Sequence, residues 1–201
     1  MNSIVFGGER ITPSKVICVA RNYVEHIHEL KNEVPSSMVL FNKPNSSITD
    51  KLKMFDGNIH YEGEICFVIK GGEIAGVGIG LDLTKREIQS VLKEKGLPWE
   101  RAKAFDGAAV LSEFVDIDGY DKINFELFIN GVLKQKGEIA QMIYKPLMVL
   151  EEIESFMSLE DGDVIMSGTP KGVGSYKLDD VFNLKLYDDK KLLIEKTWKV
   201  G

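Results

Sequence analysis

The stretch from residue 59 to residue 69 most constrains how this chain can fold, because it joins acidic side chains to a buried strand. Residues 65–69 form a continuous apolar run rich in β-branched and aromatic residues, which is typical of a strand in a core. Side chains alternate along a strand, so His60, Glu62 and Glu64 are expected on one face. Two carboxylates about 7 Å apart beside a core repel each other. They need either a cation or an edge position in water, and this stretch alone leaves both open.

A second strand is predicted over residues 74–81, antiparallel to the first across a turn at Gly71 and Gly72. The small residues of this strand predict a close approach by neighbouring backbone. Asp82 follows the strand and could supply a third carboxylate, or could be an acidic residue that favours the start of the next helix. Three carboxylates with water make an all-oxygen site, which suits Mg²⁺ or Mn²⁺ rather than zinc.

A helix is predicted over residues 22–31, where apolar residues recur at helical spacing. His26 and Glu29 are three residues apart, so they are neighbours on one face of this helix. A histidine that a carboxylate orients can act as a general base. The alternative is an amphipathic surface helix that takes no part in chemistry.

The other elements indicate the fold class. Thr84 and Glu87 form a capping-box pattern that predicts a helix from Thr84 onward, and residues 144–157 predict another helix with Leu147 on its apolar side. Asn130-Gly131 predicts a tight hairpin turn. Strands do not alternate regularly with helices, which favours an α+β fold with antiparallel or mixed sheets over a Rossmann fold or a TIM barrel.

Composition excludes several classes of protein. A length of 201 residues predicts one domain over residues 1–201. The formal net charge of −6 and the lack of a Lys/Arg block argue against nucleic-acid binding. No apolar run is long enough for a membrane span, and the N-terminus lacks the pattern of a secretory signal. Cys18 and Cys66 each lie in an apolar run, which indicates buried free thiols in a reduced, cytoplasmic protein.

Six segments of the chain form a pattern when taken in order. They are Val19-Ala20-Arg21-Asn22-Tyr23 with His26 and Glu29, Lys43-Pro44, His60-Tyr61-Glu62-Gly63-Glu64, Leu81-Asp82-Leu83-Thr84 with Gln89, Gly96-Leu97-Pro98-Trp99 with Lys103, and Ser167-Gly168-Thr169-Pro170-Lys171-Gly172-Val173-Gly174. In order and spacing the chain resembles the fumarylacetoacetate hydrolase family, in its short branch of acylpyruvases and oxaloacetate decarboxylases. It departs from that family in a shorter segment between Glu64 and Asp82, and in residues 106–110, which lack a proline usual there.

The resemblance implies a mixed β-sandwich roll of the type of that family's C-terminal domain, usually a homodimer, with Mg²⁺ or Mn²⁺ bound. By position it assigns three roles to residues of this chain. The metal ligands are Glu62, Glu64 and Asp82; the catalytic residues are His26 and Glu29, on a helix that acts as a mobile lid, and Lys103; the substrate contacts are Arg21, Gln89 and Thr169.

These residues imply a small 2-oxo acid as substrate. Its keto and carboxylate oxygens can chelate the ion, and the metal and Lys103 would stabilise an enolate of the pyruvyl part. An acylpyruvate would be cleaved by water that His26 activates, whereas oxaloacetate would lose CO₂ and leave the same enolate. The alternatives are keto–enol tautomerisation of oxaloacetate, an isomerase or decarboxylase activity of the same family, and a non-catalytic metal-binding protein.

Overall fold

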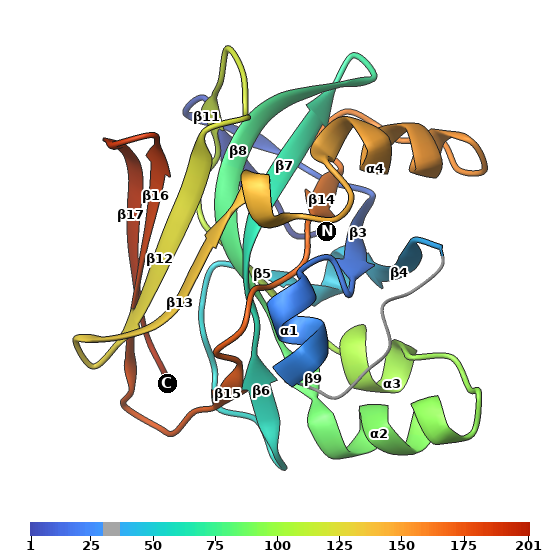
Figure 1. Cartoon of the computed structure of the whole chain (residues 1–201), viewed down its shortest axis with the longest axis vertical. Helices are drawn as coiled ribbons and strands as arrows, with labels where there is room; N and C mark the ends of the chain where they lie inside the picture. Colours follow the sequence, from blue (N-terminus) through green and yellow to red (C-terminus); the bar gives the residue numbers. More distant parts are fainter. Residues whose placement is uncertain (30–36) are drawn as a thin grey trace.

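The computed structural model describes residues 1–29 and 37–201, and the chain is built around one long mixed sheet (Figure 1). The sheet runs in the order β4 (Val39–Pro44), β3 (Lys15–Ala20), β14 (Val164–Met166), β7 (Gly63–Lys70), β8 (Glu73–Asp82), β10 (Ala109–Leu111) and β5 (Ile48–Thr49), and β11 (Val115–Asp116) also pairs with β8. β14 is parallel to β3 and β10 is parallel to β5, whereas β7 and β8 are antiparallel, as the sequence predicts.

A second sheet is antiparallel and lies across from the central strands of the first (Figure 1). Its order is β13 (Val132–Glu138), β12 (Ile123–Ile129), β16 (Val181–Asp188) and β17 (Lys191–Lys199). The predicted hairpin between β12 and β13 is confirmed, with positive φ at Asn130 (51°) and Gly131 (78°). Smaller pairings join β15 (Gly174–Ser175), β6 (Ile59–Tyr61) and β9 (Thr84–Lys85), and β1 (Ile4–Phe6) with β2 (Glu9–Ile11).

The helices are short. They are α1 (Val24–Glu29), α2 (Arg86–Glu94), α3 (Glu100–Lys103) and α4 (Pro146–Glu154), with 3₁₀ turns at Asn45–Ser47 and Ile139–Gln141. In Figure 1, α1, α2 and α3 lie near one another in the lower right of the view, whereas the second sheet lies at the left, and residues of all three helices line one cavity. None of the helices in the described residues has the length and apolar character that crossing a membrane requires. The predicted α+β class with mixed sheets is confirmed.

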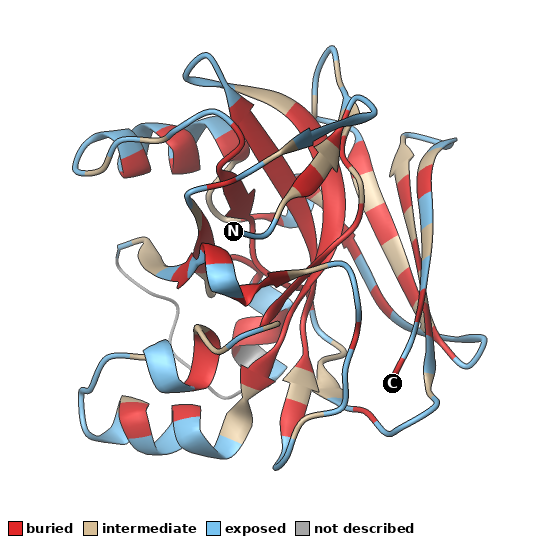
Figure 2. Ribbon diagram, turned by 180° about the vertical axis from the view of Figure 1, so that it is seen from behind, coloured by how far each residue is buried: buried red, intermediate tan, exposed pale blue. Residues whose placement is uncertain are grey.

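Strand β7 is buried on both faces, which explains its continuous apolar run (Figure 2). Ile65 and Phe67 pack in the core between the two sheets. Cys66 and Val68 point the other way, into a smaller core on the opposite face of the long sheet. β7, the strand that carries Glu64, is therefore held in place by packing on both of its faces.

The predictions about small side chains are also confirmed. Cys18 and Cys66 are free and buried, and burial raises the pKa of both thiols well above the usual value. On β8, a Cβ at Gly78 would lie only 2.9 Å from the ring of Phe114. Glycine there permits the predicted close approach of neighbouring chain.

Two helix predictions need correction. The capping box is wrong: Thr84 lies in β9, α2 begins at Arg86, and Lys85 before it makes no side-chain cap. The Thr84 hydroxyl instead accepts a hydrogen bond of 2.6 Å from Lys103 Nζ. A contact with a residue distant in the sequence therefore replaces the helix cap that was predicted for this hydroxyl. Leu147 is 51% exposed, because α4 turns its other face to the core.

Asp163 ties together the starts of the parallel strands β3 and β14. Its buried carboxylate accepts hydrogen bonds from the backbone N–H and hydroxyl of Ser14 (both 2.8 Å), the backbone N–H of Lys15 (3.0 Å) and that of Glu160 (3.0 Å), and it pairs with Lys15 Nζ at 2.6 Å. Burial alone would raise the pKa of Asp163, but these hydrogen bonds lower it below the usual value. The far ends of the same strands lead to Arg21 and to residues 167–168.

Asp163→Asn is expected to destabilise the protein at pH 7 by about 2 kcal/mol, because the variant loses charge-assisted hydrogen bonds. A carboxyl with a lowered folded pKa stabilises the fold above its unfolded pKa, so the difference from wild type should shrink as pH falls below about 3.9. Urea denaturation at pH 7 and pH 3 measures both effects. Exposed Asp161 is the matched control, and an Asp161→Asn loss as large as that of Asp163→Asn would contradict the argument.

Candidate active site

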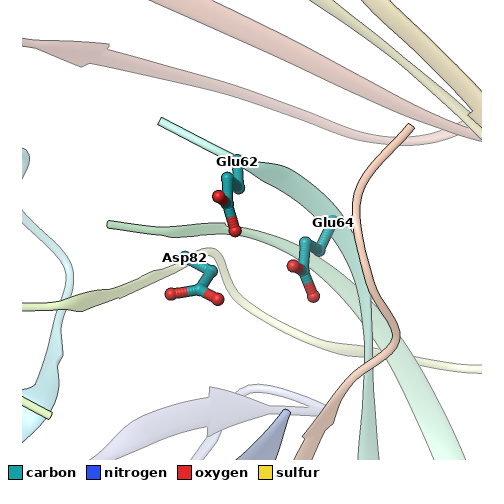
Figure 3. A group of neighbouring side chains, drawn as sticks. All are labelled: Glu62, Glu64 and Asp82. Atoms are coloured by element: carbon teal, nitrogen blue, oxygen red, sulfur yellow. The ribbon is translucent and has the colours of Figure 1, made fainter. Parts of the chain in front are cut away.

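Three carboxylates meet where β6, β7 and β8 come together. Glu62 lies between β6 and β7, Glu64 is the second residue of β7, and Asp82 ends β8. The antiparallel register pairs Glu64 with Gly80, and the Asp82 backbone N–H donates to the Glu62 carbonyl oxygen at 2.8 Å. One carboxylate oxygen of each residue lies within 4.8 Å of those of the others, and Figure 3 shows the three groups turned toward a common space. The structure thus brings together the three residues that the sequence named as ligands.

Lys103, at the end of α3, binds two of these carboxylates. Its Nζ lies 2.8 Å from Glu62 Oε2 and 2.7 Å from Asp82 Oδ2. Burial disfavours its charge, but the two carboxylates outweigh burial and raise the pKa of Lys103 above the usual range. Burial would raise the pKa of Glu62, yet Lys103 and Arg86 together hold it well below its usual value. Lys103 is therefore charged and Glu62 ionised at neutral pH.

Two further cations complete the pairing of Glu62 and Asp82. Arg86 at the start of α2 places Nη2 2.6 Å from Glu62 Oε1. Lys43, fully buried on β4, places Nζ 2.8 Å from Asp82 Oδ1 and also donates to the backbone oxygen of Lys103. The Lys43–Asp82 contact is an ion pair without the alignment of a hydrogen bond.

Glu64 differs from the other two carboxylates. Its Oε2 accepts a hydrogen bond of 2.8 Å from the backbone N–H of Gly168, and no cationic side chain in residues 1–29 and 37–201 lies within ion-pair distance of it. Burial, and then the charges of Asp82 and Glu62, raise the pKa of Glu64 well above its usual value. Gly168 has φ +96°, and a Cβ there would lie 2.8 Å from the Asn22 side chain, so this close donor requires glycine.

The residues present fit a divalent cation. Glu62 and Asp82 already have positive partners, whereas Glu64 is a buried carboxylate without one in the part of the chain that the structure describes. A buried charge is costly unless it is paired or bound to a metal. All three side chains offer oxygen, which suits Mg²⁺ or Mn²⁺. Glu62, Glu64 and Asp82 would hold such an ion. It would supply the positive charge that balances the carboxylate of Glu64.

The predicted histidine–carboxylate pair forms on α1. His26 Nδ1 lies 3.0 Å from Glu29 Oε2, and Glu29 Oε1 accepts a hydrogen bond of 3.0 Å from the Gly172 backbone N–H. The His26 side chain is 8% exposed and lines the same cavity as the three carboxylates. Glu29 thus orients the imidazole toward the site. The predicted helix residues Leu30 and Lys31 lie outside the described residues.

The expected substrate contacts also line this cavity, but two of them already have partners. The Thr169 hydroxyl donates to the Gly63 carbonyl oxygen at 2.9 Å and accepts from Gln135 Nε2 at 2.8 Å. Gln89 Oε1 accepts a hydrogen bond of 2.9 Å from Arg86, and its amide N–H₂ donates to no residue within 1–29 and 37–201. Arg21 lines the cavity with a positive φ of 58°, a conformation that is strained for residues other than glycine.

Sequence reasoning missed two cations of the site. Arg86 could have been found, because it precedes Gln89 by three residues and so shares a helix face with it. Lys43 stands in one of the six segments that carry the resemblance, but no role was assigned to it, since a lysine in a strand is normally exposed. His60 lies outside the carboxylate group and its Nδ1 accepts a hydrogen bond of 3.3 Å from Arg86 Nε.

Comparisons with known proteins agree with this geometry. The sequence matches the family described as "Fumarylacetoacetate (FAA) hydrolase C-terminal" over residues 15–196. It is 36% identical to an oxaloacetate tautomerase of Escherichia coli over 187 residues, which is 83% of this chain and 85% of the relative. It is 38% identical to a mitochondrial oxaloacetate decarboxylase of Dictyostelium discoideum over 186 residues, 83% of this chain and 85% of the relative.

A solved structure is similar over almost the whole chain. It is fumarylpyruvate hydrolase of Pseudomonas aeruginosa in complex with Mn²⁺ and pyruvate, with a TM-score of 0.89, 27% sequence identity, and coverage of 99% of this chain and 95% of that chain. The fold is the one that the resemblance implies, and the relatives are enzymes. This chain belongs to the fumarylacetoacetate hydrolase family.

Proposed function

We propose that this protein is a divalent-metal-dependent enzyme that forms an enolate from oxaloacetate, by decarboxylation or by keto–enol tautomerisation. The observation that carries the proposal is the buried group of three carboxylates in which Glu64 has no cationic partner among the described residues. The relatives named oxaloacetate tautomerase and oxaloacetate decarboxylase support the choice of substrate. The Mn²⁺ and pyruvate in the similar hydrolase support the choice of cofactor and of a 2-oxo acid.

The residues around the carboxylates suit the charge that develops in such a reaction. A divalent cation held by Glu62, Glu64 and Asp82 would polarise the keto oxygen of the substrate as a Lewis acid. Lys103 carries a fixed ammonium group in the same buried place, where a positive charge stabilises a developing oxyanion by several kcal/mol. Gln89 presents amide donors to the same cavity and can orient the substrate carboxylate.

One site can serve both oxaloacetate reactions. In decarboxylation the C3–C4 bond breaks, CO₂ leaves, and the electron pair enters the pyruvate enolate. In tautomerisation a base removes a proton from C3 and a proton is added to the keto oxygen. His26, oriented by Glu29, is placed to be that base. Decarboxylation needs no base at C3, so it depends less on His26.

Hydrolysis of an acylpyruvate is the second candidate, and the His26–Glu29 pair favours it. His26 would take a proton from a water molecule that attacks the distal carbonyl carbon. The C–C bond to the pyruvyl part then breaks, releasing pyruvate enolate and a carboxylic acid. The product pyruvate is the ligand of the similar fumarylpyruvate hydrolase structure.

A substrate panel tests these proposals. Oxaloacetate and acetylpyruvate are assayed with Mg²⁺, with Mn²⁺ and with chelator, following the ketone and enol forms by absorbance and CO₂ and pyruvate by coupled assays. Metal-dependent turnover of oxaloacetate is the expected result. Cation binding by calorimetry without turnover of either substrate would favour a non-catalytic metal-binding protein.

A homodimer and a cytoplasmic location remain predictions from the sequence.

His26→Ala is expected to slow acetylpyruvate hydrolysis by about 10²- to 10⁴-fold, because general-base catalysis is lost. Decarboxylation of oxaloacetate should fall much less, since it needs no attacking water. Steady-state rates on both substrates measure the difference. Glu25→Ala is the control, because Glu25 is exposed on the same helix. Equal losses on both substrates would rule out water activation as the role of His26.

A further inference from the structure

A row of three side chains on α2 lines the cavity. Arg86, Gln89 and Lys93 stand at i, i+3 and i+7, so they lie along one face of the helix, and all three line the cavity that holds the carboxylates. Arg86 already binds Glu62, and Gln89 binds Arg86. Lys93 lies about 10 Å further along the helix axis than Arg86. Its backbone therefore stands at a different part of the cavity wall from that of Arg86, and within the described residues its side chain pairs with none of the three carboxylates.

Lys93 is positioned in the cavity wall by aromatic contact rather than by an acid. Its Nζ lies 5.4 Å from the ring centroid of Trp99, which in turn packs against Phe41 at 5.7 Å. Neither Lys93 nor Arg21 forms an ion pair with any residue of the described ranges, and the buried Nε of Arg21 has no hydrogen-bond partner there. Burial, and then the charge of Arg21, lower the pKa of Lys93 to about 8. Positive charge is crowded at this wall.

The charges at the carboxylate end balance without these two residues. Three cations face three carboxylates there, namely Lys43, Arg86 and Lys103 against Glu62, Glu64 and Asp82. A divalent ion would add two positive charges, and the carboxylate and enolate oxygen of a 2-oxo acid would offset them. Arg21 and Lys93 are left for an anionic group on another part of the substrate.

We propose that Lys93 and Arg21 bind the far carboxylate of a 2-oxo dicarboxylic acid, and so favour substrates that have two carboxylates over those with a neutral acyl end. The inference rests on the proposed function, because it takes the 2-oxo-acid end to bind beside Glu62, Glu64 and Asp82. Trp99 holds Lys93 in place by a cation–π contact and leaves its ammonium hydrogens for the ligand. A neutral acyl group would leave both cations unpaired in a partly desolvated wall.

Lys93→Met is expected to raise KM for the tautomerisation of oxaloacetate by about 10- to 100-fold, the loss of one charge-assisted hydrogen bond, with kcat little changed because the far carboxylate keeps its charge in that reaction. KM for acetylpyruvate, which has no far carboxylate, should stay as in wild type. Lys93→Arg should keep the low KM for oxaloacetate. Lys95→Met is the matched control, because Lys95 is exposed at the end of the same helix. An equal rise in KM for both substrates would overturn the inference and leave the proposed function standing.

A binding experiment decides the inference without turnover. Malate and lactate share a 2-hydroxy-acid end and differ in the far carboxylate, so both are titrated by calorimetry into the Mn²⁺-loaded protein. Wild type is expected to bind malate at least about tenfold more tightly than lactate, and Lys93→Met to bind the two alike. Equal binding of the two ligands by wild type would overturn the inference. The malate preference without turnover of any 2-oxo acid would overturn only the proposed function.

Discussion

Replacing Glu64 by glutamine is expected to abolish stabilisation by Mn²⁺ and turnover together, while the metal-free protein becomes more stable than wild type. Wild type should gain about 2.7 kcal/mol when Mn²⁺ is present at a hundred times its Kd, and the variant should gain nothing. Glutamine can keep the hydrogen bond from Gly168, because its side-chain oxygen accepts as the carboxylate does. The two proteins therefore differ only in the charge that the metal needs.

The sign of the stability change follows from the raised pKa of Glu64. A carboxyl with a raised folded pKa binds its proton more tightly in the folded state, so the metal-free protein loses stability as pH rises above the unfolded value of about 4.3. Glutamine does not titrate, and this loss should vanish in the variant. Urea denaturation of the metal-free proteins between pH 4 and pH 8 measures it.

Glu62→Gln is the matched control for this argument, because the pKa of Glu64 is raised whereas that of Glu62 is lowered. Its carboxylate is paired with Arg86 and Lys103, which lower its pKa, so its removal should destabilise the metal-free protein. Both variants lose a metal ligand, but only one loses ion pairs. Destabilisation of equal size in the two metal-free variants would show that Glu64 is not the uncompensated member of the group.

The arrangement of the three carboxylates could be predicted because it depends on local rules. Alternation along a strand predicted Glu62 and Glu64 on one face, and their carboxylates do meet, although the chain leaves strand geometry at Glu62 between β6 and β7. The turn at Gly71–Gly72 returns the chain so that Asp82 ends beside them. The two-faced burial of β7 likewise follows from its unbroken apolar run. These inferences need only the pairing of neighbours in the sequence.

The electrostatic differences among the carboxylates could not be predicted, because they depend on residues far away in the sequence. Lys43 reaches Asp82 from β4, and Gly168 reaches Glu64 from the loop after β14. No periodicity in the sequence encodes which carboxylate these groups meet. Thr84 is a second example. Its position just before a helix predicts a helix cap, but its hydroxyl accepts a hydrogen bond from the distant Lys103 instead. The local rule failed at Thr84 because the buried ammonium group of Lys103 binds the hydroxyl oxygen that the cap would have used.

Lys103→Met is expected to destabilise the metal-free protein by about 3 to 5 kcal/mol, because it removes one partner from a buried ion-pair network. Glu62 and Asp82 would then face each other without the ammonium group that now lies within 2.8 Å of both. Thermal unfolding with and without Mn²⁺ measures the loss. Arg101→Met, at an exposed position of the same helix, should leave stability unchanged.

Adding Mn²⁺ to Lys103→Met separates the two roles of this lysine. A divalent ion can replace the lost charge between the carboxylates, so the variant should gain more stability from Mn²⁺ than wild type does. The ion should not restore turnover if Lys103 also stabilises the negative charge on the substrate, because that needs a second positive group beside the developing oxyanion. Full recovery of kcat in the Mn²⁺-loaded variant would show that Lys103 serves only the fold. Recovery of stability without recovery of kcat would place its ammonium group in the chemical step.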